Sequence, residues 1–340
     1  NNITLPIDDF FKFDQKALVS ATPIELNDPR FKEQNFKMIE IQPTFDYKKE
    51  LWLHHTNNTL QALKTVLSKL DNEEAAPLPI CVFINSTDII YSLMKQLDLL
   101  EDSAVFCAPK SVDKLKKNRF CNVYEEWNKD KMKRYNFFTS RFFNAVDMEL
   151  EEQPHVIMLT DVYFAEHTMI DPYTDAIQIV GRFRNGVSSI TYISNTKKGL
   201  PQRSKEEIKG YLICSKEIYR TMKNFYDCAT DRASRDAYRA ALESLPFNRM
   251  LDRNGRENWF AIDNYMDEEL MKNYFYDENS LYKAYDNCDS FIVYHAGYYC
   301  PLGDSERLKR ENKSQSIKDK RKEIVRQLEM LGDCVTEMEL

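Results

Sequence analysis

Short apolar runs alternate with amphipathic segments along the first 197 residues, and this alternation constrains the fold more than any other feature of the chain. Each run has the length of a buried strand, and segments between several of them place apolar residues on one helical face. Alternating strands and helices predict an α/β fold with a parallel sheet. The strand-like runs are residues 16–22, Phe36–Ile41, Leu51–His54, Ile80–Ile84, Ala104–Cys107, Asn136–Thr139, Val156–Leu159 and Ser189–Ile193. The two clearest helical faces contain Leu60, Leu63, Val66, Leu67 and Leu70, and Ile89, Ile90, Leu93, Met94 and Leu97.

The character of the sequence changes after Thr196, where a turn-rich segment at 197–201 is followed by long helical patterns. Residues 204–300 are rich in aromatic side chains, and they predict a mainly helical accessory region. Within them, Phe291–Tyr294 fits either a strand or a buried turn of helix. Residues 304–340 are highly charged with sparse apolar positions, which predicts a long solvated helix.

The composition limits the partners and the compartment. With 47 basic and 54 acidic residues, the net charge of −7 excludes a uniformly basic surface, so any nucleic-acid binding must be regional. The eight cysteines have no CxxC spacing, which indicates free thiols in a reducing compartment. No apolar run approaches 18 residues, and we expect a cytoplasmic location without membrane contact.

The segment Gln178–Arg184, with the sequence QIVGRFR, is suited to binding a triphosphate. On a helix, Gln178 and Arg182 lie four residues apart on one face, and Gly181 leaves room for a phosphate or another backbone. Guanidinium groups bind phosphate in a forked geometry and neutralise charge during phosphoryl transfer. The alternative interpretation is that Arg182 and Arg184 form only surface ion pairs.

Further polar residues end or follow the strand-like runs. Hydroxyl groups at strand ends, and free N–H groups where a helix begins, suit the phosphate oxygens of a nucleic acid. Structural helix capping is the alternative role for several of these residues, above all for Ser86. The residues concerned are Ser20 and Thr22 of Ser20-Ala21-Thr22, Asn85 and Ser86, Lys110, and Thr139 and Ser140 with Asp147 downstream.

The order SAT, then TS with a downstream Asp, then QxxGRxR resembles the C-terminal half of the superfamily 2 (DEAD/DEAH-like) helicase and translocase motor. The resemblance implies the end of one RecA-like domain at 1–30, carrying the SAT strand, and a second RecA-like domain at 31–197. The helical region would then occupy 198–301 and the charged helix 302–340. Asn185 stands where the family usually has its last arginine, and Ala145 stands where it has a glycine. The shorter GRxR form looks similar to that of the viral origin-binding helicases.

The resemblance also implies roles for individual residues. Arg182 first, and Arg184 second, would be the arginine finger on ATP, assisted by Gln178. Gly181 would border the nucleotide, and Asp147 would contact its ribose or an arginine of QxxGRxR. Ser20 and Thr22 would couple the nucleotide state to the grip on DNA or RNA. The residues expected to face the nucleic-acid strand are Asn85, Ser86, Lys110, Thr139 and Ser140.

Half of an ATP site is missing from the sequence. There is no Gly-x-x-x-x-Gly-Lys-Ser/Thr loop, and Asp267-Glu268-Glu269 has a helical setting instead of ending an apolar strand. We therefore expect the ligands for the ATP phosphates and for Mg²⁺ in a first RecA-like domain upstream of Asn1. We expect no metal ligands here and no ATP hydrolysis by this chain alone.

Two other interpretations stay open. The chain could be a non-catalytic RecA-like module whose aromatic helical region, within 204–340, binds a protein partner. Alternatively, tyrosines and arginines of 204–300 could form a nucleic-acid-binding domain independent of any motor. Arg232, Arg235 and Arg239 share one helical face there, although a solvated face paired with acidic neighbours is the simpler interpretation.

Overall fold

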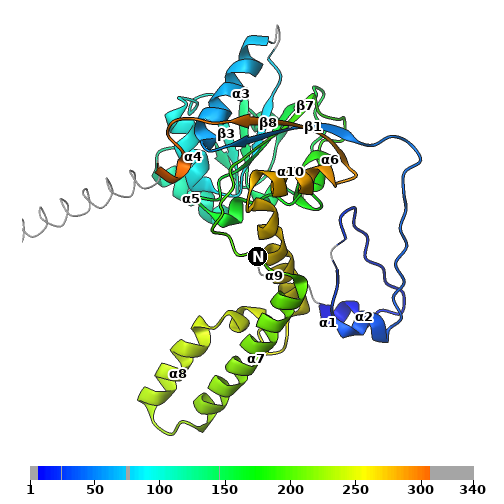
Figure 1. Cartoon of the computed structure of the whole chain (residues 1–340), viewed down its shortest axis with the longest axis vertical. Helices are drawn as coiled ribbons and strands as arrows, with labels where there is room; N and C mark the ends of the chain where they lie inside the picture. Colours follow the sequence, from blue (N-terminus) through cyan, green and yellow to red (C-terminus); the bar gives the residue numbers. More distant parts are fainter. Residues whose placement is uncertain (1–6, 24, 74–76, 145, 307–340) are drawn as a thin grey trace, which may run out of the picture. The chain divides into compact units, whose positions relative to one another are not determined.

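The structure, a computed structural model, describes residues 7–23, 25–73, 77–144 and 146–306 (Figure 1). The chain forms two compact units, each assembled from separated segments. The helical unit consists of residues 1–49, 171–182 and 197–292, and the sheet unit consists of residues 50–170, 183–196 and 293–340. The polar residues that follow the central strands belong to the sheet unit, whereas Gln178 and Arg182 belong to the helical unit.

An eight-stranded sheet in the order β4-β3-β5-β2-β6-β7-β1-β8 confirms the predicted α/β fold class. Neighbouring strands from β4 to β1 pair in parallel. On the β1–β8 pair, Trp52 stacks on Tyr294 and His54 on Tyr298, so the two strands also run in the same direction. The strands are β1 Lys49–Thr56, β2 Ile80–Phe83, β3 Ser103–Phe106, β4 Val123–Tyr124, β5 Tyr135–Phe138, β6 His155–Thr160, β7 Ser189–Ser194 and β8 Phe291–Tyr298.

The central strands are mostly apolar because both of their faces are covered. Every residue of β2, β3, β5 and β6 is buried. Ile80 pairs with Tyr135 on one side and with His155 on the other, so these three strands begin at the same level of the sheet. Their carboxyl ends therefore open onto one edge.

Three helices cover one face of this sheet: α3 Thr59–Glu73, α4 Thr87–Gln96 and α5 Pro109–Lys117. Apolar residues of the helices, such as Leu63, Leu93 and Leu115, form one core with the strands. Burial of a side chain of this size contributes about 1.5–3 kcal/mol. The other face carries stacked phenylalanines: Phe83 and Phe106 lie on either side of Phe138, with ring centroids 5.0 and 4.9 Å from it. Short 3-10 turns in this unit are η1 Lys129–Lys131, η2 Ser140–Phe142 and η3 Glu166–Thr168.

The helical unit has its own smaller core, formed by Ile208, Leu212, Phe247, Met250, Ile262 and Met266. Ser204 and Glu207 form a capping box at the start of the longest helix, which satisfies two backbone N–H groups. The elements of this unit are α1 Ile7–Phe10, α2 Pro29–Glu33, α6 Asp175–Gly181, α7 Lys205–Cys228, α8 Arg232–Ser244, η4 Pro246–Met250, α9 Trp259–Met271, η5 Lys272–Phe275 and α10 Glu278–Asp286. No helix in the described part of the chain is long and apolar enough to cross a membrane.

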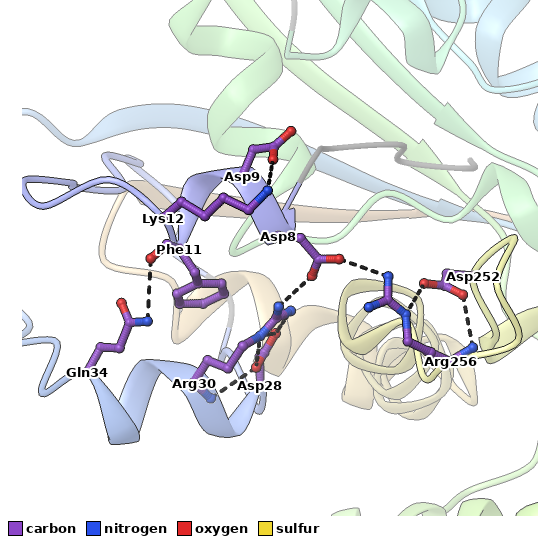
Figure 2. A network of polar contacts seen from close by, with 9 residues as sticks. All are labelled: Asp8, Asp9, Phe11, Lys12, Asp28, Arg30, Gln34, Asp252 and Arg256. Atoms are coloured by element: carbon purple, nitrogen blue, oxygen red, sulfur yellow. Dashed lines mark hydrogen bonds and ion pairs between the residues drawn. The ribbon is translucent and has the colours of Figure 1, made fainter.

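Polar contacts tie the N-terminal segment into the helical unit (Figure 2). Arg30 donates to Asp8 over 2.6 Å and to Asp28 over 2.7 Å, while Arg256 donates to the other oxygen of Asp8 over 2.8 Å. Hydrogen bonds from the two arginines are the main reason that the pKa of Asp8 is lowered. Asn27 also donates to the buried carboxylate of Asp263 over 2.7 Å. The segment before β1 is therefore held by side chains distant in sequence.

Two predicted strands are absent. Residues 16–22, which contain the SAT segment, and residues 36–41 form neither strand nor helix. Val19 is 96% exposed and Ile41 is 88% exposed. A strand needs a neighbour that pairs its backbone N–H and C=O groups, and the described sheet supplies none for either segment. The predictions of strands at residues 16–22 and 36–41 were therefore wrong.

The other elements expected from the sequence are partly confirmed, and some lie outside the described residues. The undecided segment Phe291–Tyr294 forms the first half of β8, and the two-residue strand β4 was not predicted. The charged helix expected at 302–340 lies outside the described residues from 307 onward, as does Ala145. The helical patterns after 204 are borne out by α7 to α10. The RecA-like domain boundaries at 1–30, 31–197 and 198–301 stay predictions.

Candidate functional site

Polar residues gather at the carboxyl edge of three adjacent strands, β3, β5 and β2. Asn85 and Ser86 follow β2, Thr139 and Ser140 follow β5, and Lys110 lies in the first turn of the helix after β3. The ends of β2 and β5 are level, because Phe83 pairs with Phe138. In open α/β sheets this edge is where ligands bind. The five residues that the sequence assigned to strand contact thus share one edge of the sheet unit.

Several of these residues also form hydrogen bonds that stabilise the fold at this edge. The hydroxyl of Ser86 accepts the backbone N–H of Ile89 over 3.4 Å, which makes Ser86 the N-cap of α4. The side-chain amide of Asn85 donates to the carbonyl of His167 over 3.0 Å. The carbonyl of Thr139 accepts the N–H of Phe142 over 2.8 Å and starts the turn η2. Lys110 is exposed. The capping role weighed for Ser86 is therefore present.

In the helical unit, the SAT segment contacts the QxxGRxR segment. Gln178 donates from its side-chain amide to the hydroxyl of Thr22 over 2.8 Å. The side-chain oxygen of the same Gln178 accepts a 2.9 Å hydrogen bond from the guanidinium of Arg182, whose Nε also donates to the Gln178 carbonyl over 3.1 Å. One glutamine therefore connects the hydroxyl of Thr22 to the guanidinium of Arg182.

There is space near Thr22, Gln178 and Arg182, which are here called the trio. Ser20 accepts the backbone N–H of Thr22 over 3.1 Å, which fixes a small turn in an otherwise irregular segment. A Cβ atom built on Gly181, at the end of α6, would meet no heavy atom within 4 Å. Gly181 is thus exposed, and no described part of the chain fills the space beside it, which is compatible with the approach of a ligand.

Arg184 has a different environment from Arg182. Its guanidinium donates to both carboxylate oxygens of Asp147, over 2.9 and 2.8 Å, and both side chains are about half exposed. The backbone N–H of Arg184 also bonds to the carbonyl of Met148 over 3.3 Å. For Arg184, the surface ion pair of the alternative interpretation is present, and pairs of this kind contribute about 0–1 kcal/mol.

Sequence reasoning missed a second polar cluster, at the carboxyl ends of β6, β7 and β1. Asp161 accepts hydrogen bonds from Asn195 over 2.8 Å and from the hydroxyl of Thr59 over 3.3 Å. Asp304 accepts from the same Asn195 over 2.9 Å and from the backbone N–H of Thr59 over 2.9 Å. Both carboxylates are only 1% exposed. Polar residues follow the strands β6 and β7 directly, so the rule used for Asn85 and Thr139 would also have found Asp161 and Asn195. Thr59 begins the helix after β1.

A strand-terminal threonine with a later aspartate, the pattern assigned to Thr139 and Asp147, also occurs after β6. Thr160 ends that strand, and Asp171 lies downstream just before α6. The carboxylate of Asp171 accepts the backbone N–H groups of Tyr173 and Thr174 over 2.7 and 2.9 Å. Burial raises the pKa of Asp171 in spite of these hydrogen bonds. The sequence therefore offers two segments, not one, for this pattern.

Two carboxylates of the helical unit, Asp175 and Asp267, have clearly raised pKa values. Burial, together with repulsion from Asp171, Asp267 and Glu268, raises the pKa of Asp175 to about 7. Burial and the same acidic surroundings raise the pKa of Asp267 to about 6. Asp267 lies within helix α9, as its sequence setting predicted. Within the described residues, no group of three His, Cys, Asp or Glu side chains is arranged to hold a metal ion.

Comparisons with known proteins found similarity among solved structures. No protein-family model matches this sequence, and no curated protein matches it. Among solved structures, the chain is similar to the C-terminal domain of the DEAD-box protein Dbp5, with 13% sequence identity and a TM-score of 0.27. The similarity covers 51% of this chain and 86% of that one. It concerns the course of the chain and says nothing about activity.

Proposed function

We propose that this chain is the C-terminal part of an ATP-dependent nucleic-acid helicase or translocase and that Arg182 is its arginine finger. The 2.8 Å hydrogen bond between Gln178 and Thr22 carries the proposal. Two short segments, each singled out for its own chemistry, are 156 positions apart in sequence and meet through the side chains expected to act together. Chance matches scattered along a chain have no reason to be in contact.

The trio offers a physical route for coupling. Gln178 uses its amide group at both ends, toward Thr22 and toward Arg182. A phosphate that draws the guanidinium of Arg182 would move the acceptor oxygen of Gln178, and thereby the hydrogen bond to Thr22. Arg182 would bind and neutralise the terminal phosphate, a role worth about 10³- to 10⁵-fold in turnover in enzymes that use an arginine finger. The change in nucleotide state would thereby be transmitted through Thr22 to the irregular segment around it.

ATP and Mg²⁺ would be held mainly by another domain. The ligands for the ATP phosphates and for Mg²⁺ would lie in that domain. ATP would supply the phosphoryl group that is transferred to water. The contribution of this chain would be the positive charge of Arg182, oriented by two hydrogen bonds to Gln178.

The carboxyl edge of β3, β5 and β2 is the proposed strand-binding surface. The amide of Asn85, the hydroxyl of Ser140 and the ammonium of Lys110 can donate to phosphate oxygens there, whereas Thr139 is only 7% exposed. Such contacts recognise the backbone of DNA or RNA without reading its sequence. Ser86 would contribute mainly by capping α4, whose free N–H groups point toward the same edge.

ATP turnover, measured with and without single-stranded nucleic acid, tests the proposal. The isolated chain and the longest natural protein that contains it should be compared. We expect no turnover by the isolated chain, and in the longer protein we expect Arg182→Ala to lower kcat about 10³-fold or more. Lys95→Gln, which removes an exposed charge from the last turn of α4, is the matched control. Unchanged kcat in the Arg182→Ala protein would overturn the proposal, and turnover by the isolated chain that Arg182→Ala abolishes would contradict the missing half-site.

A second candidate function is a non-catalytic module that binds a protein partner through the helical region. The observation in its favour is that two isoleucines of α7, Ile213 and Ile218, are exposed. An apolar partner surface would cover them. This candidate predicts that Ile213→Asp abolishes binding of the partner, while Arg182→Ala has no effect on any activity of the protein.

A further inference from the structure

The hairpin of α7 and α8 extends well beyond the core of its unit. The buried residues of α7, which are Ile208, Leu212 and Ser215, all lie in its first half, and α8 buries only Leu242 near its end. The two helices lie side by side (Figure 1). Residues 216–241, here called the hairpin tip, contain no buried residue. At 1.5 Å per residue, the tip part of α7 is about 20 Å long. A stretch of paired helices without a buried residue indicates a surface that serves something else.

The hairpin tip carries an aromatic pair. Phe225 of α7 stacks on Tyr238 of α8, with ring centroids 5.8 Å apart and an angle of 20° between the rings. Phe225 is nevertheless 50% exposed. An exposed ring face supported from behind by a second ring is suited to stacking with a nucleic-acid base.

Positive charges surround the neighbouring Tyr226. The Lys223 ammonium lies 4.8 Å from the ring centroid, and the Arg239 guanidinium lies 5.9 Å from it. Arg239 also donates to the Tyr226 hydroxyl over 3.3 Å, and Arg235 donates to the carbonyl of Ala229 in the turn between the helices. The hydrogen bond from Arg239, with the charges of Arg239, Lys223 and Arg235, lowers the pKa of Tyr226. The potential at the hairpin tip is therefore locally positive.

The acidic neighbours do not cancel this charge. Lys223 forms an ion pair with Asp227 over 2.5 Å, and Asp236 lies 3.7 Å from Arg232 and 3.9 Å from Arg239. All of these pairs are exposed, and exposed pairs are weak enough to exchange for phosphate. Between 220 and 239 the basic residues are Arg220, Lys223, Arg232, Arg235 and Arg239, and the acidic ones are Asp227, Asp231 and Asp236. This stretch has an excess of two positive charges, whereas the whole chain has a net charge of −7. The regional basic surface that an acidic chain needs in order to bind nucleic acid is present here.

We propose that the hairpin tip binds single-stranded nucleic acid, with Phe225 stacked on a base and with Lys223, Arg235 and Arg239 in contact with phosphates. The proposal rests on the nucleic-acid part of the proposed function, and it adds a contact separate from the strand-end residues of the sheet unit. The combination of one exposed ring with several cations favours a nucleic acid over a protein partner, whose binding surface would be more apolar.

Fluorescence anisotropy of labelled 20-nucleotide oligo(dT) and oligo(U), titrated with the whole chain at several salt concentrations, tests the proposal. We expect the double variant Arg235→Gln, Arg239→Gln to weaken binding at least tenfold and to reduce the salt slope by about 1.4, because each phosphate contact on a single strand contributes about 0.7. Phe225→Leu should weaken binding about tenfold with an unchanged salt slope, since stacking releases no counterions. Lys95→Gln, which removes one exposed charge outside the hairpin tip, is the control and should bind like the wild type.

Ultraviolet cross-linking of the wild-type chain to a bromouridine-containing strand keeps the proposal testable if a variant fails to fold. The cross-linked peptide should contain Phe225 or Tyr226. Binding within twofold of the wild type by both tip variants, cross-links confined to other peptides, or no binding by the wild type would each overturn the proposal. If tip variants lose strand binding while Arg182→Ala keeps full ATP turnover, the proposed motor function fails and the tip site stands. If the tip variants bind like the wild type while Arg182→Ala loses ATP turnover, the tip site fails and the proposed motor function stands.

Discussion

Asp304 accepts a 2.9 Å hydrogen bond from the backbone N–H of Thr59, the first residue of α3, so a carboxylate near the end of the described chain caps the first helix of the sheet unit. The same oxygen accepts from Asn195 over 2.9 Å, and the backbone N–H of Asp304 donates to the carbonyl of Asn57 over 2.6 Å. A negative charge at a helix N-terminus is favourable, and here it is also removed from water. The segment that follows β8 is therefore hydrogen-bonded to residues that follow β1 and β7, at the carboxyl ends of these two strands.

Removal of the Asp304 carboxylate should therefore destabilise the sheet unit. We expect Asp304→Ala to lower the free energy of unfolding by about 2–4 kcal/mol, because the N–H of Thr59 and the amide of Asn195 lose a charged acceptor in a buried site. Asp304→Asn keeps an acceptor oxygen and should cost about half as much. Urea denaturation followed by circular dichroism measures both values. A loss below 0.5 kcal/mol for Asp304→Ala would show that this capping contact is dispensable.

The hydrogen bond between Gln178 and Thr22 can be measured directly with a double-mutant cycle. Thr22→Val, Gln178→Ala and the double variant should give a coupling free energy of about 0.5–1.5 kcal/mol, the usual net contribution of one such bond. If the segments act together as proposed, both single variants should also lower nucleic-acid-stimulated ATP turnover in the longer protein. Additive effects on stability, with no coupling, would mean that the two segments are independent in solution.

Asp175 predicts an unusual pH dependence of stability. Its pKa is about 7 in the folded chain, against an ordinary value of 3.8. The folded state therefore holds a proton between pH 4 and 7 that the unfolded state has lost, so stability falls as pH rises through this window and is constant above it. The shift corresponds to about 4 kcal/mol at most, and we expect about 2–4 kcal/mol because Asp175 is only partly buried.

Asp175→Asn removes this penalty without changing the size of the side chain. The variant should be more stable than the wild type by about 2–4 kcal/mol at pH 8 and should have nearly equal stability at pH 4. Denaturant titrations at the two pH values provide the comparison, and Asp113→Asn, an exposed carboxylate of α5, is the control. An equal gain at both pH values would mean that something other than ionisation is responsible.

The parts of the fold that could be predicted from sequence are those determined by local pattern. Runs such as Ile80–Ile84 and Val156–Leu159 became β2 and β6 because a strand covered on both faces must be apolar throughout. The run at 16–22 also contains apolar residues, but it has no strand beside it in the described sheet. A local pattern carries no information about neighbours.

The candidate site likewise has one part that the sequence pattern predicts and one part that it does not predict. Asn85, Thr139 and Lys110 share a sheet edge because parallel strands end together, which the strand assignments already implied. The bond from Gln178 to Thr22 and the cap from Asp304 to Thr59 join positions 156 and 245 apart. No spacing rule selects one pairing at such separations, since many polar side chains could have met there, and only the folded core decides which do.

Arg184 and Arg182 should differ in function, and this difference is the last prediction. Arg184 forms a two-oxygen ion pair with Asp147 on the surface of the sheet unit, whereas the hydrogen bonds of Arg182 to Gln178 lie in the helical unit beside Thr22. We expect Arg184→Ala to change the free energy of unfolding by less than about 1 kcal/mol, because exposed pairs contribute little. Its kcat for ATP should fall far less than that of Arg182→Ala.

The charge-swapped pair Arg184→Asp, Asp147→Arg separates an ion-pair role of Arg184 from a role on ATP. If the arginine serves only the ion pair, the swap restores the wild-type stability and turnover, because the attraction is kept with the charges exchanged. If Arg184 contacts phosphate, the swap restores stability and leaves turnover low, since a carboxylate at position 184 would repel the nucleotide. Steady-state ATP hydrolysis and urea denaturation on the same preparation distinguish the two results. Turnover lower in Arg184→Ala than in Arg182→Ala would reverse the order of the two arginines and make Arg184 the finger.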